Sequence, residues 1–173
     1  HENTTWAVFG QSSYQVNEKL NITGGIRYTH DDKSLFVGDQ NVNGFAVVIG
    51  AASIQDYDDI NVDDGQVSWE LSANYRIDAD TSVFARLANG FRAQTIQGRD
   101  VAFEGAPSVA EAETINSVEV GFKTDTLDDT LRLNAAAFYY VIDDMQFSAI
   151  GGGANNTALV NADKGVGYGF EIV

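Results

Sequence analysis

In five of the segments that are predicted to be β-strands, the charged residues all occupy the same set of alternate positions, and apolar residues occupy the other set. In one of these segments, apolar residues at positions 118, 120 and 122 alternate with Glu119 and Lys123. Because successive strand residues point to opposite faces, the pattern predicts a sheet with one apolar face and one polar, charged face. The charged set includes Arg27, Glu70, Arg76, Arg86, Glu119, Lys123 and Arg132.

Seven strands are expected, at residues 5–15, 20–31, 66–77, 82–92, 113–124, 131–145 and 161–173. Short polar turns at 16–19, 78–81 and 125–130 alternate with long connections at 32–65, 93–112 and 146–160. Short turns at one end and long loops at the other are typical of a transmembrane β-barrel. The predicted fold is therefore all-β, an antiparallel up-and-down meander that forms part of such a barrel.

The apolar side of the alternation is the side that would face lipid. No apolar run approaches the roughly 20 residues that a membrane helix needs, so any crossing would be made by strands. Trp6 and Tyr14 share one parity and lie roughly 26 Å apart along a strand, which would place one aromatic ring near each membrane interface. The residues predicted to face lipid are Trp6, Tyr14, Trp69, Leu71, Val118, Val120, Phe122 and Tyr139.

Two other classes of protein fit the same alternation. A passive porin-like barrel shares the strand pattern, and a soluble β-sandwich or adhesin module would bury the apolar parity against a second sheet. Exposure of the apolar face separates the sandwich from the barrels. The chain begins at His1 and ends at Val173 inside an alternating segment, so we expect it to be part of a longer protein with further strands.

The charge distribution argues against a nucleic-acid partner. The net charge is −15, and the long connections carry most of it, with eight aspartates and one lysine between residues 31 and 65 alone. Binding to nucleic-acid phosphates requires a basic face, and the strongly acidic composition of this chain does not fit that requirement. The acidic connections also fit solvated loops outside a membrane.

No arrangement of residues predicts an enzyme, a cofactor or a metal centre. Histidine occurs only at His1 and His30, cysteine is absent, and no serine lies in a Gly-x-Ser-x-Gly turn. Residues 39–44 match the first half of a calcium loop, but Gly50 stands where the twelfth-position glutamate is required. The aspartates between 56 and 64 have no ordered ligand spacing. We therefore expect no cofactor and no metal site.

Five short motifs, in this order and spacing, resemble strands of the TonB-dependent outer-membrane receptors. The first is Trp6-Ala7-Val8-Phe9-Gly10-Gln11 followed by Leu20-Asn21-Ile22-Thr23-Gly24-Gly25-Ile26-Arg27-Tyr28, which resembles a hairpin of the barrel. The second is Val83-Phe84-Ala85-Arg86 leading to Asn89-Gly90-Phe91-Arg92. The third is Glu113-Thr114 with Glu119-Val120-Gly121-Phe122-Lys123, and the fourth runs from Leu131 through Tyr140 to Asp144-Met145-Gln146. The fifth is Asn161-Ala162-Asp163-Lys164 with Gly169-Phe170-Glu171, where Asp163 replaces the usual glycine.

The resemblance implies a fold and a set of partners. It implies a barrel of 22 strands in the outer membrane of a Gram-negative bacterium, closed by an amino-terminal plug domain, which imports a ferric siderophore or a similar scarce nutrient. Energy would come from a TonB-type protein acting on a short box before the plug, and neither plug nor box is in this sequence. The charged set named first would face the barrel lumen and the plug, while the identity of the ligand and its binding residues stays open.

Overall fold

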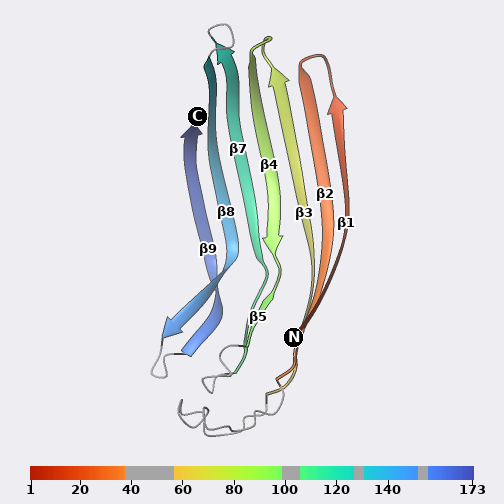
Figure 1. Cartoon of the computed structure of the whole chain (residues 1–173), viewed down its shortest axis with the longest axis vertical. Coiled ribbons are helices and arrows are strands. Elements are labelled where there is room, and N and C mark those ends of the chain that lie inside the picture. Colours follow the sequence, from red (N-terminus) through yellow and green to blue (C-terminus); the bar gives the residue numbers. More distant parts are fainter. Residues whose placement is uncertain (38–56, 99–105, 127–130, 152–155) are drawn as a thin grey trace.

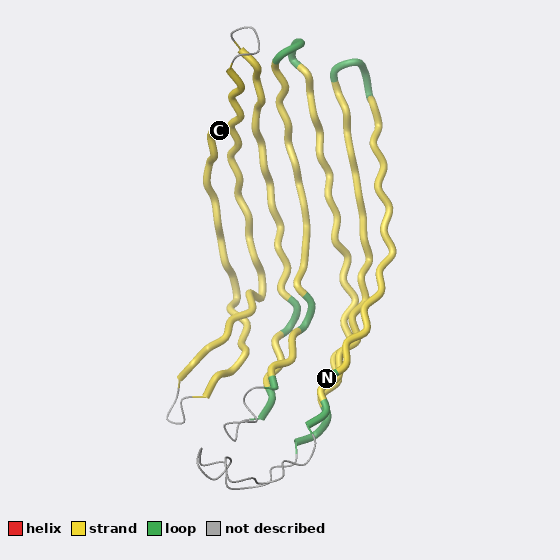
Figure 2. The backbone as a smooth tube through the Cα atoms, in the orientation of Figure 1, coloured by secondary structure: helices red, strands yellow, loops and turns green. Residues whose placement is uncertain are grey.

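Seven strands of the computed structural model lie side by side in one antiparallel sheet, in the order β1-β2-β3-β4-β7-β8-β9. The structure describes residues 1–37, 57–98, 106–126, 131–151 and 156–173. The predicted all-β, antiparallel up-and-down meander is confirmed (Figures 1 and 2). The strands of this sheet are β1 (Glu2–Gln15), β2 (Leu20–Leu35), β3 (Ile60–Arg76), β4 (Thr81–Arg92), β7 (Glu113–Thr126), β8 (Leu131–Gly151) and β9 (Asn156–Ile172).

Two tight turns at one end of the sheet are built in the same way. Asn17 Oδ1 accepts hydrogen bonds from the backbone N–H groups of Lys19 and Leu20, at 2.9 and 3.0 Å. Asp78 Oδ1 likewise accepts from the N–H groups of Asp80 and Thr81, at 3.0 and 2.8 Å. Asn and Asp favour turns because their side chains can take over backbone hydrogen bonds in this way. We call this end of the sheet the short-turn end and the opposite end the long-loop end.

The strands reach further toward the long-loop end than the sequence predicted. The predicted loop 32–65 contributes its first residues to β2 and its last to β3, and the predicted loop 146–160 is shortened by β8 and β9 in the same way. The extensions of β2 and β3 carry polar residues on both faces, for example Asp63 and Asp64 in β3. Apolar alternation therefore ends before the backbone ladder does, because a ladder requires only paired N–H and C=O groups.

A second correction concerns residues 93–112, which were predicted to be a loop without strands. They contain β5 (Thr95–Gln97) and β6 (Ser108–Ala110), which pair with each other as a separate two-stranded sheet. Three-residue strands are too short for an alternation pattern to reveal. This hairpin packs against β9.

The ladder between β3 and β4 covers only part of either strand. It runs from Trp69↔Asn89 to Arg76↔Ser82 at the short-turn end. Toward the long-loop end β3 continues in register with β2, while β4 continues in register with β7. The two halves of the sheet diverge from there, as Figure 1 shows. A hydrogen bond of 2.6 Å from Lys33 Nζ of β2 to the carbonyl oxygen of Gln94 links the two halves beyond the divergence.

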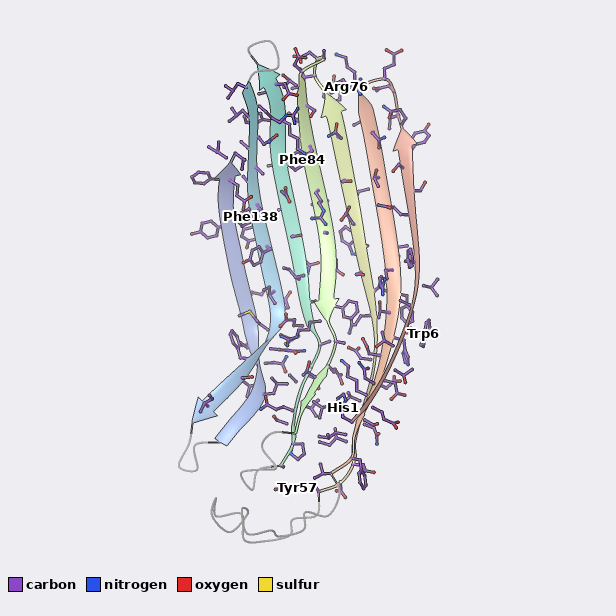
Figure 3. All side chains as sticks on the ribbon, viewed as in Figure 1. His1, Trp6, Tyr57, Arg76, Phe84 and Phe138 are labelled. Atoms are coloured by element: carbon purple, nitrogen blue, oxygen red, sulfur yellow. The ribbon has the colours of Figure 1, made fainter. Side chains whose placement is uncertain are left out.

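The described part of the chain has almost no hydrophobic core. Its one fully buried hydrophobic residue is Ala110 of the β5–β6 hairpin. Figure 3 shows side chains projecting from both faces of a single layer. No helix in the described ranges is long and apolar enough to cross a membrane. The stability of this sheet therefore depends on backbone ladders, cross-strand pairs and whatever covers its apolar face.

Aromatic rings lie across glycines of neighbouring strands. Tyr140 of β8 is directly opposite Gly167 of β9, and a Cβ atom added at Gly167 would overlap the Tyr140 ring. Phe84 of β4 covers Gly121 of β7 in the same way, 2.6 Å from the position that a Cβ would take. The glycines thus allow the rings to lie flat against the sheet.

Candidate functional site

The pairing register sorts the predicted residues onto two faces of the sheet. Directly opposed residues share a face, so the pairs Ser72↔Arg86 and Arg86↔Glu119 put these side chains together, and Leu71↔Leu87↔Val118↔Tyr139 form a row on the other face. The face that we call the polar face carries Arg27, Glu70, Arg76, Arg86, Glu119, Lys123 and Arg132. The apolar face carries Trp6, Tyr14, Trp69, Leu71, Val118, Val120, Phe122 and Tyr139.

An ion pair occupies the middle of the polar face. Arg86 donates from Nε and Nη2 to the same oxygen, Glu70 Oε2, at 3.0 and 2.5 Å. Glu119 lies directly opposite Arg86 across the β4–β7 ladder, yet the guanidinium turns toward Glu70 on β3. The pair therefore links β3 to β4 just where their ladder is about to end.

A hollow of about 510 Å³ lies beside this ion pair on the polar face. Arg27 and Phe9 form part of its wall, with the Arg27 guanidinium carbon 5.9 Å from the centre of the Phe9 ring. Arg27 Nε also donates to the hydroxyl of the buried Thr29, at 2.9 Å. The stacked ring and the hydroxyl fix the orientation of the cation, which leaves one positive charge beside a charge-neutral pair.

The remaining predicted cations gather near the short-turn end. Arg76, Lys123 and Arg132 line one polar hollow of about 480 Å³ (Arg76 is labelled in Figure 3). Arg132 Nε pairs with Asp125 Oδ1 at 2.7 Å across the β7–β8 ladder, and Lys123 Nζ lies 5.7 Å from the centre of the Phe84 ring. The structure thus brings three of the seven predicted residues into one basic cluster.

The apolar face is bounded by two levels of aromatic side chains. Near the long-loop end, the Trp6 ring lies 5.4 Å from the rings of both Tyr28 and His30, and His30 Nε2 is 3.2 Å from Asp63. Near the short-turn end, Tyr75 lies directly opposite Leu20. His30 and Leu20 are ten residues apart on β2, so the two levels are about 33 Å apart along the strand and about 25 Å apart along the axis of a barrel with strands tilted by about 40°.

Nothing in the described residues covers the face between these levels. Val120 is 50% exposed and Leu71 is 46% exposed, although both lie in the middle of the sheet. A soluble domain rarely leaves such a contiguous apolar surface in water. The second sheet that the described residues form, β5 with β6, bonds to Gln146 and Asn161 on the polar face and leaves this apolar face uncovered.

Sequence reasoning missed one buried polar residue, Gln146 of β8, which is 7% exposed. Its side-chain nitrogen donates to the carbonyl oxygens of Ala93 and Glu111, and its side-chain oxygen accepts from the Thr95 hydroxyl. A glutamine after an alternating strand has no distinctive sequence signal. Its hydrogen bonds become visible only in the folded structure, where residues 93–111 lie against β8.

No group of three or more metal-binding side chains occurs in the part of the chain that the structure describes. The calcium-loop resemblance at residues 39–44 lies outside that part, as does Asp56. Among the other aspartates of this stretch, Asp63 pairs with His30, and Asp64 accepts a hydrogen bond from Gln66 at 2.9 Å.

Comparison with known proteins connects this arrangement to a family. The chain is 31% identical over 170 residues to the pesticin receptor of Yersinia enterocolitica, a match that covers 97% of this chain and 23% of that receptor. It is 26% identical over 162 residues to the rhizobactin receptor of Rhizobium meliloti, covering 81% of this chain and 21% of the relative. The chain therefore spans less than a quarter of the curated relatives that it matches.

A solved structure and a family model agree with these sequence matches. The ferric yersiniabactin uptake receptor FyuA from Yersinia pestis superposes with a TM-score of 0.72 at 23% identity, over 98% of this chain and 23% of that one, and so supports the same fold. The family model for the β-barrel of TonB dependent receptor-like proteins matches residues 1–173. The matching family is a β-barrel family of receptors, and its members are neither β-sandwich modules nor enzymes. The chain belongs to the TonB-dependent receptor-like β-barrel family.

Proposed function

We propose that this chain is part of the barrel of an outer-membrane receptor that imports a ferric siderophore with energy from a TonB-type protein. The observation that carries the proposal is the uncovered apolar face of a single-layer sheet, in a chain of this family. Lipid is the partner that such a face suits, because lipid tails bury apolar side chains without hydrogen-bonding demands. Residues 1–173 would then be a contiguous part of a barrel of 22 strands in a Gram-negative outer membrane.

The spacing of the aromatic levels supports this placement. A separation of about 25 Å along the barrel axis equals the height of the apolar band of outer-membrane barrels. Aromatic side chains favour both boundaries because their apolar rings and polar atoms suit the interface between lipid and water. In this proposal the short-turn end faces the periplasm and the long-loop end faces the exterior.

The polar face would then line the lumen and contact the receptor's own plug domain. Its charges are of both signs, with the Glu70–Arg86 pair in the middle and the basic cluster of Arg76, Lys123 and Arg132 at the periplasmic end. Charged hydrogen bonds between wall and plug give an orientation-specific contact, and they break without exposing apolar surface. The ferric yersiniabactin uptake receptor shares this fold, which supports an iron chelate as the proposed ligand.

The test is iron uptake by the full-length receptor in a host that lacks its own siderophore receptors. Cells are supplied with ⁵⁵Fe bound to yersiniabactin or to rhizobactin, under iron limitation, with and without a functional TonB protein. The proposal expects uptake of at least one chelate that requires both the receptor and TonB. Uptake that persists without TonB would indicate a passive pore, and a receptor absent from the outer-membrane fraction would contradict the placement.

A further inference from the structure

The hairpin of β5 and β6 is attached to the sheet by one of its two faces. Its register pairs Thr95 with Ala110 and Gln97 with Ser108, so these four side chains share a face. That face meets β8 and β9, because Ala110 is fully buried and the Ser108 hydroxyl accepts a hydrogen bond of 2.9 Å from the N–H of Leu159. The attachment is therefore specific in orientation.

Gln146 joins both limbs of the hairpin at their bases. Its Nε2 donates to the carbonyl oxygens of Ala93, before β5, and Glu111, after β6, at 3.0 and 2.9 Å. Its Oε1 accepts from Thr95 Oγ1 at 3.0 Å, and its backbone N–H donates to Glu113 Oε2 at 2.7 Å. A side-chain amide has two donors and one acceptor oxygen, and here all three are used in a buried site.

Further contacts reinforce the attachment from two other strands, β9 and β2. Asn161 of β9, directly opposite Gln146, accepts from the N–H of Glu111 and donates to its carbonyl oxygen, at 2.9 and 3.0 Å. Lys33 of β2, in the other half of the sheet, donates a hydrogen bond to the carbonyl oxygen of Gln94. All of these side chains lie on the polar face or extend it. The connection after β4 is thus folded across the polar face at the long-loop end.

The face of the hairpin that points away from β8 and β9 is apolar. Ile96 and Val109 lie directly opposite each other on it; Val109 is 38% exposed and Ile96 is half-buried. Opposed branched side chains form a small apolar patch at the mouth of the polar face. Such a patch suits the apolar or aromatic part of a bulky ligand and not its charged groups.

We infer that Gln146 is a positioning residue: it fixes the hairpin as a permanent part of the entrance, so that Ile96 and Val109 meet the incoming ligand. This inference rests on the proposed function, because the entrance matters only if a ligand passes it. The hairpin then acts as a rigid part of the wall and not as a swinging loop. Gln146 itself does not touch the ligand.

Hydrogen exchange of the full-length receptor in detergent tests the positioning step without any ligand. In Gln146→Ala, the amides of residues 93–98 and 106–111 should exchange at least about tenfold faster, because several buried hydrogen bonds are lost together. Thr95→Val removes one of those bonds and should give a smaller increase. The matched control is Gln11→Ala, on the same polar face but without a side-chain hydrogen bond among the described residues, and it should change nothing.

Two exchange results would overturn the inference: fast exchange of the hairpin in the unsubstituted receptor, or unchanged exchange in Gln146→Ala. Exchange in β7 serves as the folding check, since it should stay slow in every variant. Misfolded Gln146→Ala would show fast exchange there too, and Thr95→Val then decides the question. These measurements hold whether or not the receptor transports an iron chelate.

Uptake kinetics test the ligand-facing step, with ⁵⁵Fe-yersiniabactin as the probe. Gln146→Ala and the double variant Ile96→Ala with Val109→Ala should raise the half-saturating concentration several-fold and leave the maximal rate unchanged, because only the encounter with the ligand is altered. The uptake control Ser12→Ala, on the apolar face, should match the unsubstituted receptor. If Gln146→Ala exchanges faster but its half-saturating concentration is unchanged, the role of the patch is overturned. If the unsubstituted receptor takes up no ⁵⁵Fe-yersiniabactin, the proposed function is contradicted for this probe, and the exchange result still stands.

Discussion

Arg86 and Glu70 form an ion pair in which two guanidinium nitrogens share one carboxylate oxygen, while Glu119 stands directly across the ladder from Arg86. The geometry links two strands at the point where their ladder is about to end. The side chains are 47% and 37% exposed, so solvent screens the pair. Its local arrangement makes the two partners unequal. Arg86 has a second carboxylate, Glu119, directly opposite it, whereas Glu70 lies opposite Gly25 and Ala88. The cation diagonal to Glu70 on β2, Arg27, is already held by Phe9 and Thr29.

We expect Arg86→Ala to destabilise the receptor more than Glu70→Ala. Removing Glu70 lets Arg86 turn to Glu119, whereas removing Arg86 leaves two carboxylates without their shared cation. For an exposed pair, the coupling energy should be about 0.2–1 kcal/mol. A double-mutant cycle on urea unfolding of the receptor in detergent measures it. Equal losses in the two single variants would contradict the proposed exchange of partners.

Arg substitutions on the two faces of the sheet should have opposite outcomes. Leu71→Arg places a charge in the middle of the apolar face, which costs about 2–4 kcal/mol if that face meets lipid. Thr23→Arg is the matched control, because Thr23 lies on the polar face, directly opposite the small polar side chains of Ser13 and Ser72. Assembly is measured by the heat-modifiable band of the receptor in outer-membrane fractions. Similar yields of folded receptor from both variants would refute the membrane assignment.

Alanine substitutions at three strand glycines should lower the stability of the receptor by amounts that depend on which atoms the new methyl group meets. At Gly121 it would lie 2.5 Å from the carbonyl oxygen of Ala135, and a backbone atom in a ladder cannot move away cheaply. At Gly167 it would meet the Tyr140 ring, which can lift from the sheet, and at Gly10 nothing lies within 4 Å. We expect the largest loss for Gly121→Ala, a smaller loss for Gly167→Ala and none for Gly10→Ala. Urea midpoints of the three variants give the order.

Asp144 is the described non-glycine residue with a positive φ, at 55°. It interrupts the β8–β9 ladder between Asp143↔Lys164 and Met145↔Ala162, and its carbonyl oxygen accepts a bond from Asn161 at 2.6 Å. Asp144→Gly should therefore be neutral or stabilising, whereas Asp144→Val should destabilise by about 1–3 kcal/mol, because branched residues resist this conformation. Thermal unfolding checks both. Asp143→Val, in extended backbone, is the control and should be tolerated better than Asp144→Val.

Much of the architecture could be read from the alternation alone. The seven strands of the sheet and the separation of charged from apolar side chains follow from a period of two, which each strand carries in its own residues. Their meander order follows from the alternation of short turns with long connections. The outward extensions of β2 and β3 could not be predicted, because polar residues on both faces leave no alternation. The hairpin of β5 and β6 was missed because its strands are too short.

The sequence by itself determined which side chains share a face, because side-chain direction in a strand is a local property of the backbone. Only the tertiary structure decided which of these side chains meet. Arg86 binds Glu70 and not Glu119, and Gln146 donates hydrogen bonds to the carbonyl oxygens of Ala93 and Glu111 at the base of the β5–β6 hairpin. These contacts depend on strand register and on the path of a connection between distant residues. Both are set by the summed hydrogen bonding of whole strands, which no single segment of sequence contains.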